Sequence, residues 1–490
     1  MISIHNYYRK IYKVLLVIFS MEGFGTLKKD SVGFWRVAFQ GISATAPAAV
    51  VSTITAASGY ADGSLPLSYL ISFVAVLFTL VAIYEYSKKI AHAGGYYAYV
   101  SRSSGPFLGI FIGMLVIGYQ IADLAFLPLF FVILVEYSIS YFTGVIFPTY
   151  LWVIIILISI VAWSIPPYMG IKPSLNYSII FGVAEVAALA ILSIAIIIIA
   201  GGKNTLTVFT PMYSPTGIHG VFLGGVFALT SFLGYGSVVT LGEEAHEPKE
   251  TIKKALIVDI LIAGAFFLTF SYAYTVGWGS FFDMAGFTNL LIPGTVETER
   301  ILGLIPALII TFFGLESFFN SSLSFTNAAT RYLYAFSRDN HVISNKISFV
   351  HKKSGVPRRA LLVLVLSYTI IAIIFGEIFG LFLGFEILAA AATIFSLIVH
   401  IITNSTVWKL YGKSERKYLY HVLMPGVASA LFLYIIYSTV YPFALPLSIA
   451  PIIVAAWAII SAVLILRARK IKSENYNNAG QSFTLYEEHI

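Results

Sequence analysis

The sequence predicts an all-α, polytopic membrane protein with about 12 transmembrane helices. Of its 490 residues, 58% are hydrophobic and 11% are charged, and the mean hydropathy is +0.87. Soluble domains carry roughly a quarter charged residues, so this composition excludes a soluble class. A helix needs about 20 apolar residues to cross the hydrocarbon core of a bilayer, and stretches of that length recur along the whole chain.

The apolar stretches give the expected positions of the spans. They are residues 34–58, 66–88, 106–136, 149–166, 177–200, 218–242, 255–277, 301–337, 360–378, 380–407, 419–441 and 446–466. With a cytoplasmic N-terminus, nearly all Lys and Arg residues fall at the inner loops, while the outer loops hold Lys203 and Arg300. This is the positive-inside pattern, and it predicts a plasma-membrane protein with both termini in the cytoplasm. The net charge of +7 is then a consequence of topology, so we expect no nucleic-acid partner.

The spans divide the chain into successive regions. We expect a cytoplasmic N-terminal segment over residues 1–30, with Met21 as an alternative start. Residues 31–200 and 201–410 then hold five spans each, residues 411–470 hold two more, and the polar tail 471–490 is expected to be disordered. The absence of cysteine excludes disulfides and thiolate metal sites.

Two spans, the first and the sixth, are interrupted by small residues near mid-membrane, at Gly41 to Pro47 and at Gly234 to Ser237. A helix in hydrocarbon has to satisfy its own backbone groups, so such breaks need another partner. When they fall at matching positions of two groups of five spans, the partner indicated is a substrate. Half-helix N-termini suit a carboxylate and freed carbonyls suit an ammonium group, so a zwitterion fits both. The alternative is that these residues serve close helix packing or a kink.

Four stretches in order resemble one family of transporters. They are the first break, the loop Ala93-Gly94-Gly95-Tyr96-Tyr97-Ala98-Tyr99, the sixth span from Phe227 to Pro248-Lys249, and Asn327 to Arg331 with Gly355 to Pro357. Over about residues 28–410 the chain is similar to the amino acid–polyamine–organocation (APC) family of permeases. The resemblance implies a LeuT-type fold, with two inverted repeats of five spans plus two C-terminal helices. It also implies secondary active transport of amino acids by alternating access, without enzymatic activity or a cofactor.

The resemblance also implies where a substrate binds. The expected substrate-binding residues are Gly41, Ile42, Ser43, Ala44, Thr45, Ser231, Phe232, Gly234, Tyr235 and Gly236. Amides around Ser43 to Thr45 would hold the carboxylate, and carbonyls around Ser231 to Gly234 would hold the amino group. Small and aromatic residues here favour a neutral, bulky apolar amino acid, with polyamines and other organic cations as the alternative cargo.

For the coupling ion, H⁺ is favoured over Na⁺, and exchange without any ion stays open. Some family members carry a lysine in span 5, where this chain has Glu185 near the corresponding place. The candidates for proton coupling are Glu185, Asp123 and Glu316, followed by Glu386 and His400. For sodium, hydroxyl ligands would come from Ser321, Ser322 and Ser324.

A second expected group lies at the inner end of the sixth span. Glu243 and Glu244 are expected to hold basic residues such as Lys88, Lys89 or Arg331 as a gate or scaffold. Two other functions compete with a carrier. A membrane enzyme is disfavoured because the sequence contains no P-loop and no G-x-S-x-G elbow, whereas a transporter-like amino acid sensor would need the same substrate site. The expected partners are an amino acid and the lipid bilayer.

Overall fold

The computed structural model describes residues 26–45, 50–148, 150–443, 445 and 447–481. The expected N-terminal segment up to residue 25, with the alternative start at Met21, lies outside the described residues. So do Ala46 and Pro47 of the first interruption.

Within the described residues the secondary structure is helical, apart from one isolated bridge between Val32 and Ala245. The α-helices are α2 (Phe34–Ala44), α3 (Val50–Ala61), α4 (Leu65–Lys89), α5 (Tyr96–Ser104), α6 (Pro106–Thr143), α7 (Leu151–Met169), α8 (Ile171–Ala200), α9 (Ile218–Phe232), α10 (Pro248–Trp278), α11 (Ala285–Thr288), α12 (Pro293–Leu302), α13 (Leu304–Arg338), α14 (Arg358–Phe379), α15 (Leu381–Thr406), α16 (Met424–Val440), α17 (Ile449–Ile471) and α18 (Ser473–Asn477). Short helical turns connect them, namely η2 (Asp62–Ser64), η3 (Gly201–Lys203), η4 (Leu206–Phe209), η5 (Pro211–Tyr213), η6 (Tyr235–Leu241), η7 (Asn345–Ser348), η8 (Val407–Leu410) and η9 (Leu419–Leu423).

Eleven helical stretches among the described residues are long and apolar enough to cross a membrane. The expected number was about 12, and the difference arises at the first span. The described part of that span consists of α2 and α3, with 11 and 12 residues, and residues 46–49 between them lie outside the described part. Residues Val50–Lys89 form one continuous helical stretch made of α3, η2 and α4. The predicted all-α polytopic class is confirmed.

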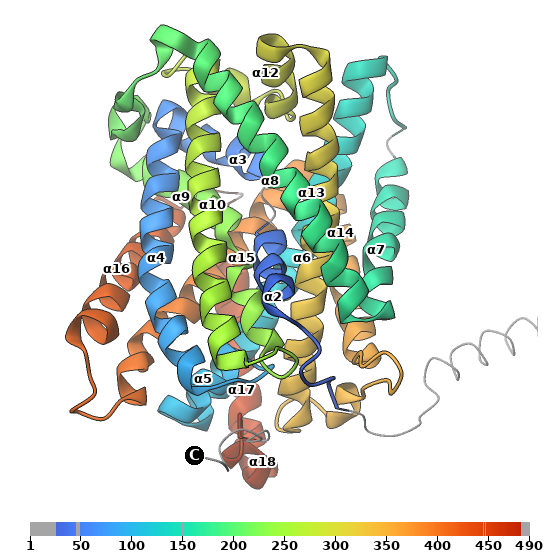
Figure 1. Ribbon diagram of the computed structural model, residues 1–490, viewed down its shortest axis with the longest axis vertical. Coiled ribbons are helices and arrows are strands. Elements are labelled where there is room, and N and C mark those ends of the chain that lie inside the picture. Colours follow the sequence, from blue (N-terminus) through green and yellow to red (C-terminus); the bar gives the residue numbers. More distant parts are fainter. Residues whose placement is uncertain (1–25, 46–49, 149, 444, 446, 482–490) are drawn as a thin grey trace, which may run out of the picture.

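The long helices run alternately up and down the bundle (Figure 1). Helices α4, α13, α15 and α17 end at the same face at which α6, α8, α10 and α14 begin, and we call this face the basic end. Lys and Arg residues gather there, whereas Lys203 and Arg300 lie at the opposite, far end. The alternation expected from the charges is therefore present in the structure.

The interrupted helices occupy the middle of the bundle. In the most apolar stretch of α6, 89% of the residues are buried, compared with 22% in α17. Stretches through α9 and α15 are 83% buried, so these helices form the inner layer with α6. Helices α16 and α17 carry many exposed isoleucine, leucine and valine side chains, as lipid-facing helices require, and α16 lies at the edge of the bundle in Figure 1.

The C-terminal tail was expected to be disordered, but its residues up to 481 are folded against the end of α13. Helix α18 carries a buried Tyr476, and Ala479 is also buried. The Gly480 N–H donates to Asp339 Oδ2 over 2.8 Å, and Asn475 donates to the Asp339 carbonyl over 3.1 Å. The polar groups that suggested disorder bind the end of α13 instead of water, which is why the prediction is wrong for this segment. Residues 482–490 lie outside the described part.

Close packing of α4 against α10 depends on Gly264. A Cβ added there would lie 2.0 Å from Cε2 of Phe73, so that ring would have to move. Overpacking of this kind costs about 1–3 kcal/mol. We expect Gly264→Ala to lower the melting temperature of the protein in detergent. Gly225→Ala is the matched control, because its Cβ would meet its nearest atoms at 3.8 Å; equal melting temperatures for the two variants would contradict this packing.

Candidate functional site

The predicted interruption of the sixth span is present. Helix α9 ends at Phe232, Leu233 is extended with ψ 141°, and Gly234 has φ +108° before η6 begins. A side chain at Gly234 would be strained by that φ, and its Cβ would lie 2.6 Å from the carbonyl carbon of Ala44. Glycine thus allows the break in this span to lie directly against the end of α2.

The end of α2 differs from the expected carboxylate site. The Thr45 N–H donates to the Gly41 carbonyl over 2.9 Å, and Ser43 and Ala44 lie in the same last helical turn. Amides in the last turn of a helix are already bonded, and the groups left free there are carbonyls. In this conformation the predicted donors around Ser43 to Thr45 are therefore engaged. Free amides belong instead to the first turn of a helix.

The two breaks border a buried space of about 30 Å³, which we call the central cavity. Its lining comes from the end of α2, the start of α3, the middle of α6, the end of α9 and the middle of α13. The lining residues are Ala44, Thr45, Val50, Ser52, Thr53, Asp123, Phe126, Leu127, Thr230, Ser231, Leu233, Phe318, Ser321 and Phe325. The lining combines polar side chains with aromatic and aliphatic ones, as in sites that orient a small amphipathic molecule.

Hydroxyl groups join the helices around this cavity. The Thr53 hydroxyl on α3 lies 2.6 Å from that of Ser231 on α9, and the Tyr69 hydroxyl on α4 lies 3.1 Å from Thr53 and 3.2 Å from Ser231. Ser321 on α13 donates to the Ala44 carbonyl over 3.1 Å. These bonds link the half-helices of both broken spans to α4 and α13.

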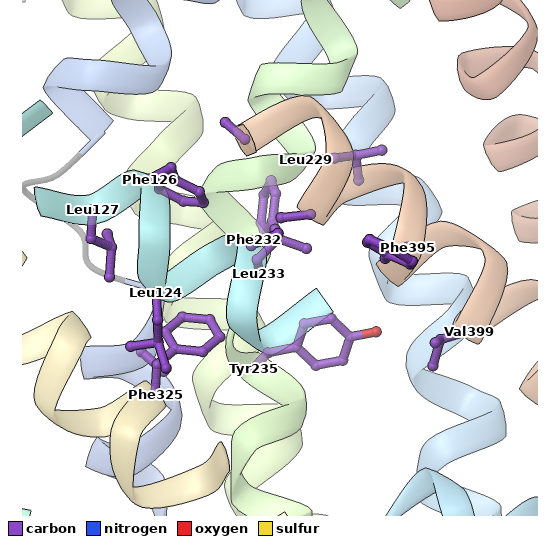
Figure 2. Close-up of a cluster of buried hydrophobic side chains, with 14 of the residues drawn as sticks. Leu124, Phe126, Leu127, Leu229, Phe232, Leu233, Tyr235, Phe325, Phe395 and Val399 are labelled. Carbon is purple, nitrogen blue, oxygen red and sulfur yellow. The ribbon is translucent and has the colours of Figure 1, made fainter. Parts of the chain in front are cut away.

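A second buried space of about 20 Å³ lies at the break in the sixth span, bordered by Gly234, Tyr235 and Gly236. His400 on α15 lines it, and its Nδ1–H donates to the Ser396 carbonyl over 2.6 Å, so its Nε2 is an acceptor. Tyr235 donates to that Nε2 over 2.5 Å. Leu233 and Phe325 line both spaces and divide them, and Figure 2 shows these two residues with Tyr235 in the buried cluster.

Of the ten expected binding residues, Ala44, Thr45, Ser231, Gly234, Tyr235 and Gly236 line one of the two spaces. Gly41, Ile42, Ser43 and Phe232 do not line either. Ser43 instead faces α8, where it donates to the Ser178 carbonyl over 3.3 Å. Phe232 packs between Phe73 and Phe267, with ring centroids 6.1 and 5.0 Å away.

Some of the expected coupling residues line the central cavity and others lie elsewhere. Asp123 and Ser321 line the central cavity, but Glu185 accepts a 2.5 Å hydrogen bond from Ser317 elsewhere between α8 and α13. Glu316 lies beside Tyr177 of α8, and Ser322 is fully buried outside the lining. Sequence reasoning missed Asp259 on α10, whose carboxylate lies so close to Gly41 that a Cβ there would be 2.0 Å from Oδ2. The signal that could have revealed it is a lone acidic residue in an apolar span.

At the basic end, Glu243 and Glu244 form buried ion pairs. Arg331 of α13 binds both carboxylate oxygens of Glu244, and both side chains are at most 2% exposed. Arg338 binds Glu243 over 3.0 and 3.1 Å, and Ala93 donates its N–H to Glu243 over 3.1 Å. The expected contact with Arg331 is thus present.

Lys88 and Lys89, the other expected partners, bind elsewhere, to Glu85 and Glu415 respectively. Both lysines sit at the end of α4, where these carboxylates are nearer. No group of three His, Asp or Glu side chains that could hold a metal ion occurs among the described residues.

The comparison with known families decides the identity of the chain. The family model described as "Amino acid permease" matches residues 37–478. The chain belongs to the amino acid permease family. This confirms the resemblance drawn from the four stretches, and the match extends beyond residue 410 into the last two spans.

Individual relatives of this permease are distant. It is 22% identical over 370 residues to the low-affinity putrescine importer PlaP of Escherichia coli K12, covering 73% of this chain and 75% of that one. It is 21% identical over 364 residues to the branched-chain amino acid permease BcaP of Bacillus subtilis, covering 70% of this chain and 74% of that one.

Two solved structures share its fold. MhsT in complex with L-phenylalanine has a TM-score of 0.59 at 15% identity, covering 84% of this chain and 99% of that one. The Eremococcus coleocola manganese transporter has a TM-score of 0.55 at 11% identity, covering 93% and 99%. These likenesses confirm the expected LeuT-type fold.

The buried pair between Arg331 and Glu244 gives a stability prediction for this permease. Removing one partner leaves an uncompensated buried charge, which costs about 3–5 kcal/mol, whereas an apolar pair of similar volume is often tolerated. We expect Arg331→Met to lower the melting temperature strongly and Arg331→Met with Glu244→Met to recover part of the loss. Lys254→Met is the control, because its 3.6 Å pair with Glu250 is exposed. A loss no larger than that of the control would show that the buried pair does not stabilise the basic end.

The contacts of Glu243 should not respond to pH near neutrality. Burial lowers the pKa of His92 to about 4. Burial opposes ionisation of Glu243, but the neighbouring His92 and Arg338, whose guanidinium also donates to it, hold its pKa below the ordinary value. A carboxylate with a lowered pKa stabilises the fold above its unfolded pKa of about 4.3 and loses that contribution as pH falls through the folded value. The difference in melting temperature between wild type and Glu243→Gln should therefore stay constant from about pH 5.5 to 8, and a change across that range would contradict the assignment.

Proposed function

We propose that this permease is a secondary active transporter that carries amino acids across the cell membrane by alternating access. The central cavity, where both interrupted spans meet, carries this proposal. The PlaP and BcaP relatives, described as a putrescine importer and a branched-chain amino acid permease, support a cargo with an amino group. We place the basic end in the cytoplasm because Lys and Arg residues gather there.

The half-helices provide complementary groups for a zwitterion. The described part of α3 begins at Val50, after the first break, and the N-terminal end of a helix has unpaired N–H groups and a positive partial charge for a carboxylate. The last turn of α9 has free carbonyls at Ser231 and Phe232 for an ammonium group. The carboxylate is thus assigned to the half-helix that follows the first break, and the amino group to the half-helix that precedes the second.

The structure is closed around this site. A water molecule needs about 10–15 Å³ of such space, so the central cavity of about 30 Å³ is too small for an amino acid. The ion pairs of Glu243 and Glu244 close the basic end. Aromatic rings pack on the other side, where the ring centroid of Phe385 lies 5.6 Å from that of Phe126, edge-on, and 4.9 Å from that of Phe130. Alternating access would open one of these two closures at a time.

The coupling ion remains a choice among H⁺, Na⁺ and exchange. Asp123 is the proton-coupling candidate that lies at the substrate site itself. For Na⁺, the Ala44 carbonyl and Ser321 hydroxyl are adjacent oxygens from α2 and α13, and the ion would replace their 3.1 Å hydrogen bond. No cofactor enters either scheme.

Counterflow into proteoliposomes tests the proposal. Vesicles preloaded with an unlabelled amino acid mixture should take up the labelled mixture in a saturable way, above empty liposomes. Gly234→Leu should abolish uptake, because the side chain would be strained and would collide with Ala44. Gly225→Ala should retain uptake, because this glycine lies on the same span and an added Cβ would meet its nearest atoms only at van der Waals distance. If the folded wild type shows no counterflow but its melting temperature rises with an amino acid, the chain is a sensor and the carrier proposal is wrong.

A further inference from the structure

The central cavity contains one ionisable side chain that the proposed binding of a zwitterion does not use. Asp123 comes from the middle of α6 and is 1% exposed. Both of its carboxylate oxygens are buried and have no hydrogen-bond partner among the described residues. It is also the one charged group in the described lining of the cavity.

A buried carboxylate without partners is costly, and proteins usually neutralise it with a hydrogen-bonded cation. The surrounding side chains do not provide one. Phe126 and Leu127 follow Asp123 on α6, while Phe318 and Phe325 face the cavity from α13. An asparagine at this position would serve packing at a much lower cost of burial, so a carboxylate here indicates a charged partner that arrives with the cargo.

The α-amino group of a substrate already has acceptors at the end of α9 around Ser231. Asp123 lies in the same lining but on a different helix, α6, and so can accept a second positive charge. A flexible aliphatic chain can pack on phenylalanine and leucine side chains while its ammonium end reaches a polar group. A compact ammonium group also suits a single carboxylate in a narrow site better than a planar guanidinium, which favours two-pronged contacts.

We propose that Asp123 is a specificity-determining residue that binds a primary ammonium group on an aliphatic chain, so that this permease prefers cationic amino acids or short diamines. The proposal rests on the proposed carrier function and concerns the same site. It revises the expectation of a neutral, apolar amino acid, which came from spans 1 and 6, whereas the acid is contributed by span 3.

The test is counterflow of labelled lysine and of labelled leucine, with equal pH on both sides and no membrane potential, so that ion coupling does not enter. Unlabelled lysine, ornithine, putrescine and leucine serve as competitors. In the wild type, lysine or putrescine should compete at concentrations at least about tenfold lower than leucine, a ratio that corresponds to ~1.4 kcal/mol. Asp123→Asn should remove this preference, so that lysine and putrescine compete no better than leucine. Asp123→Glu, which keeps the charge, should retain part of it.

Asp259→Asn is the matched control. Asp259 is also a buried carboxylate without a partner among the described residues, but it lies outside the cavity lining. This variant should keep the wild-type order of competitors. Strong competition by putrescine would identify a diamine cargo, and competition by lysine and ornithine without putrescine would identify a cationic amino acid; either result supports the proposal.

Three results would overturn it. The first is a wild type in which leucine competes better than every cation. The second is an Asp123→Asn variant that keeps the cation preference and loses the response to an imposed proton gradient, which would make Asp123 a proton carrier. In both cases counterflow itself still operates, so the carrier function stands. The third is wild-type protein that folds but shows no counterflow of any competitor, which would remove the carrier function together with this proposal.

Discussion

Backbone groups in the middle of a membrane need a hydrogen-bond partner, and the rest of this structure follows from how two spans meet that need. The sixth span stops at Phe232 and resumes as a different helix after Gly234, and its break lies against the end of α2. Neither break could exist facing lipid. The described residues beside both breaks, among them Thr45, Val50 and Leu233, therefore lie among the inner helices and line the central cavity.

The inner layer is held by polar contacts as well as by apolar packing. The hydroxyls of Thr53, Ser231 and Tyr69 join three helices beside the central cavity. Toward the basic end, His400 and Tyr235 join α15 to the broken span. Such bonds are individually modest, about 0.5–1.5 kcal/mol, so they can be exchanged for other bonds when the helices move. A transporter needs that property, because its two closures have to open without unfolding the bundle.

The closure at the basic end uses stronger interactions. Glu244 and Arg331 are almost fully buried, and Glu243 binds Arg338 together with the loop that begins at Ala93. These contacts tie the stretch after η6 to α13 and to the loop before α5, and so join three separate parts of the chain. The described tail adds a further contact, since Gly480 binds Asp339 at the end of α13. Opening of this end therefore requires several linked contacts to separate together.

The sequence by itself determined the membrane class, the approximate spans, the alternation of charge between the two ends and the family, because hydrophobic length and charge placement are local properties. It also located the break at Gly234, since glycine in an apolar span leaves a local signal. The tertiary structure decided what depends on helix rotation and neighbours: that Ser43 and Phe232 face away from the cavity, that Glu185 binds Ser317, and that Arg331 and Arg338 divide the two glutamates between them. It also placed Asp123 in the central cavity and Asp259 outside it. In a helix that is apolar on every side, no periodic pattern marks the face toward the substrate, so only packing can show which buried acid reaches it.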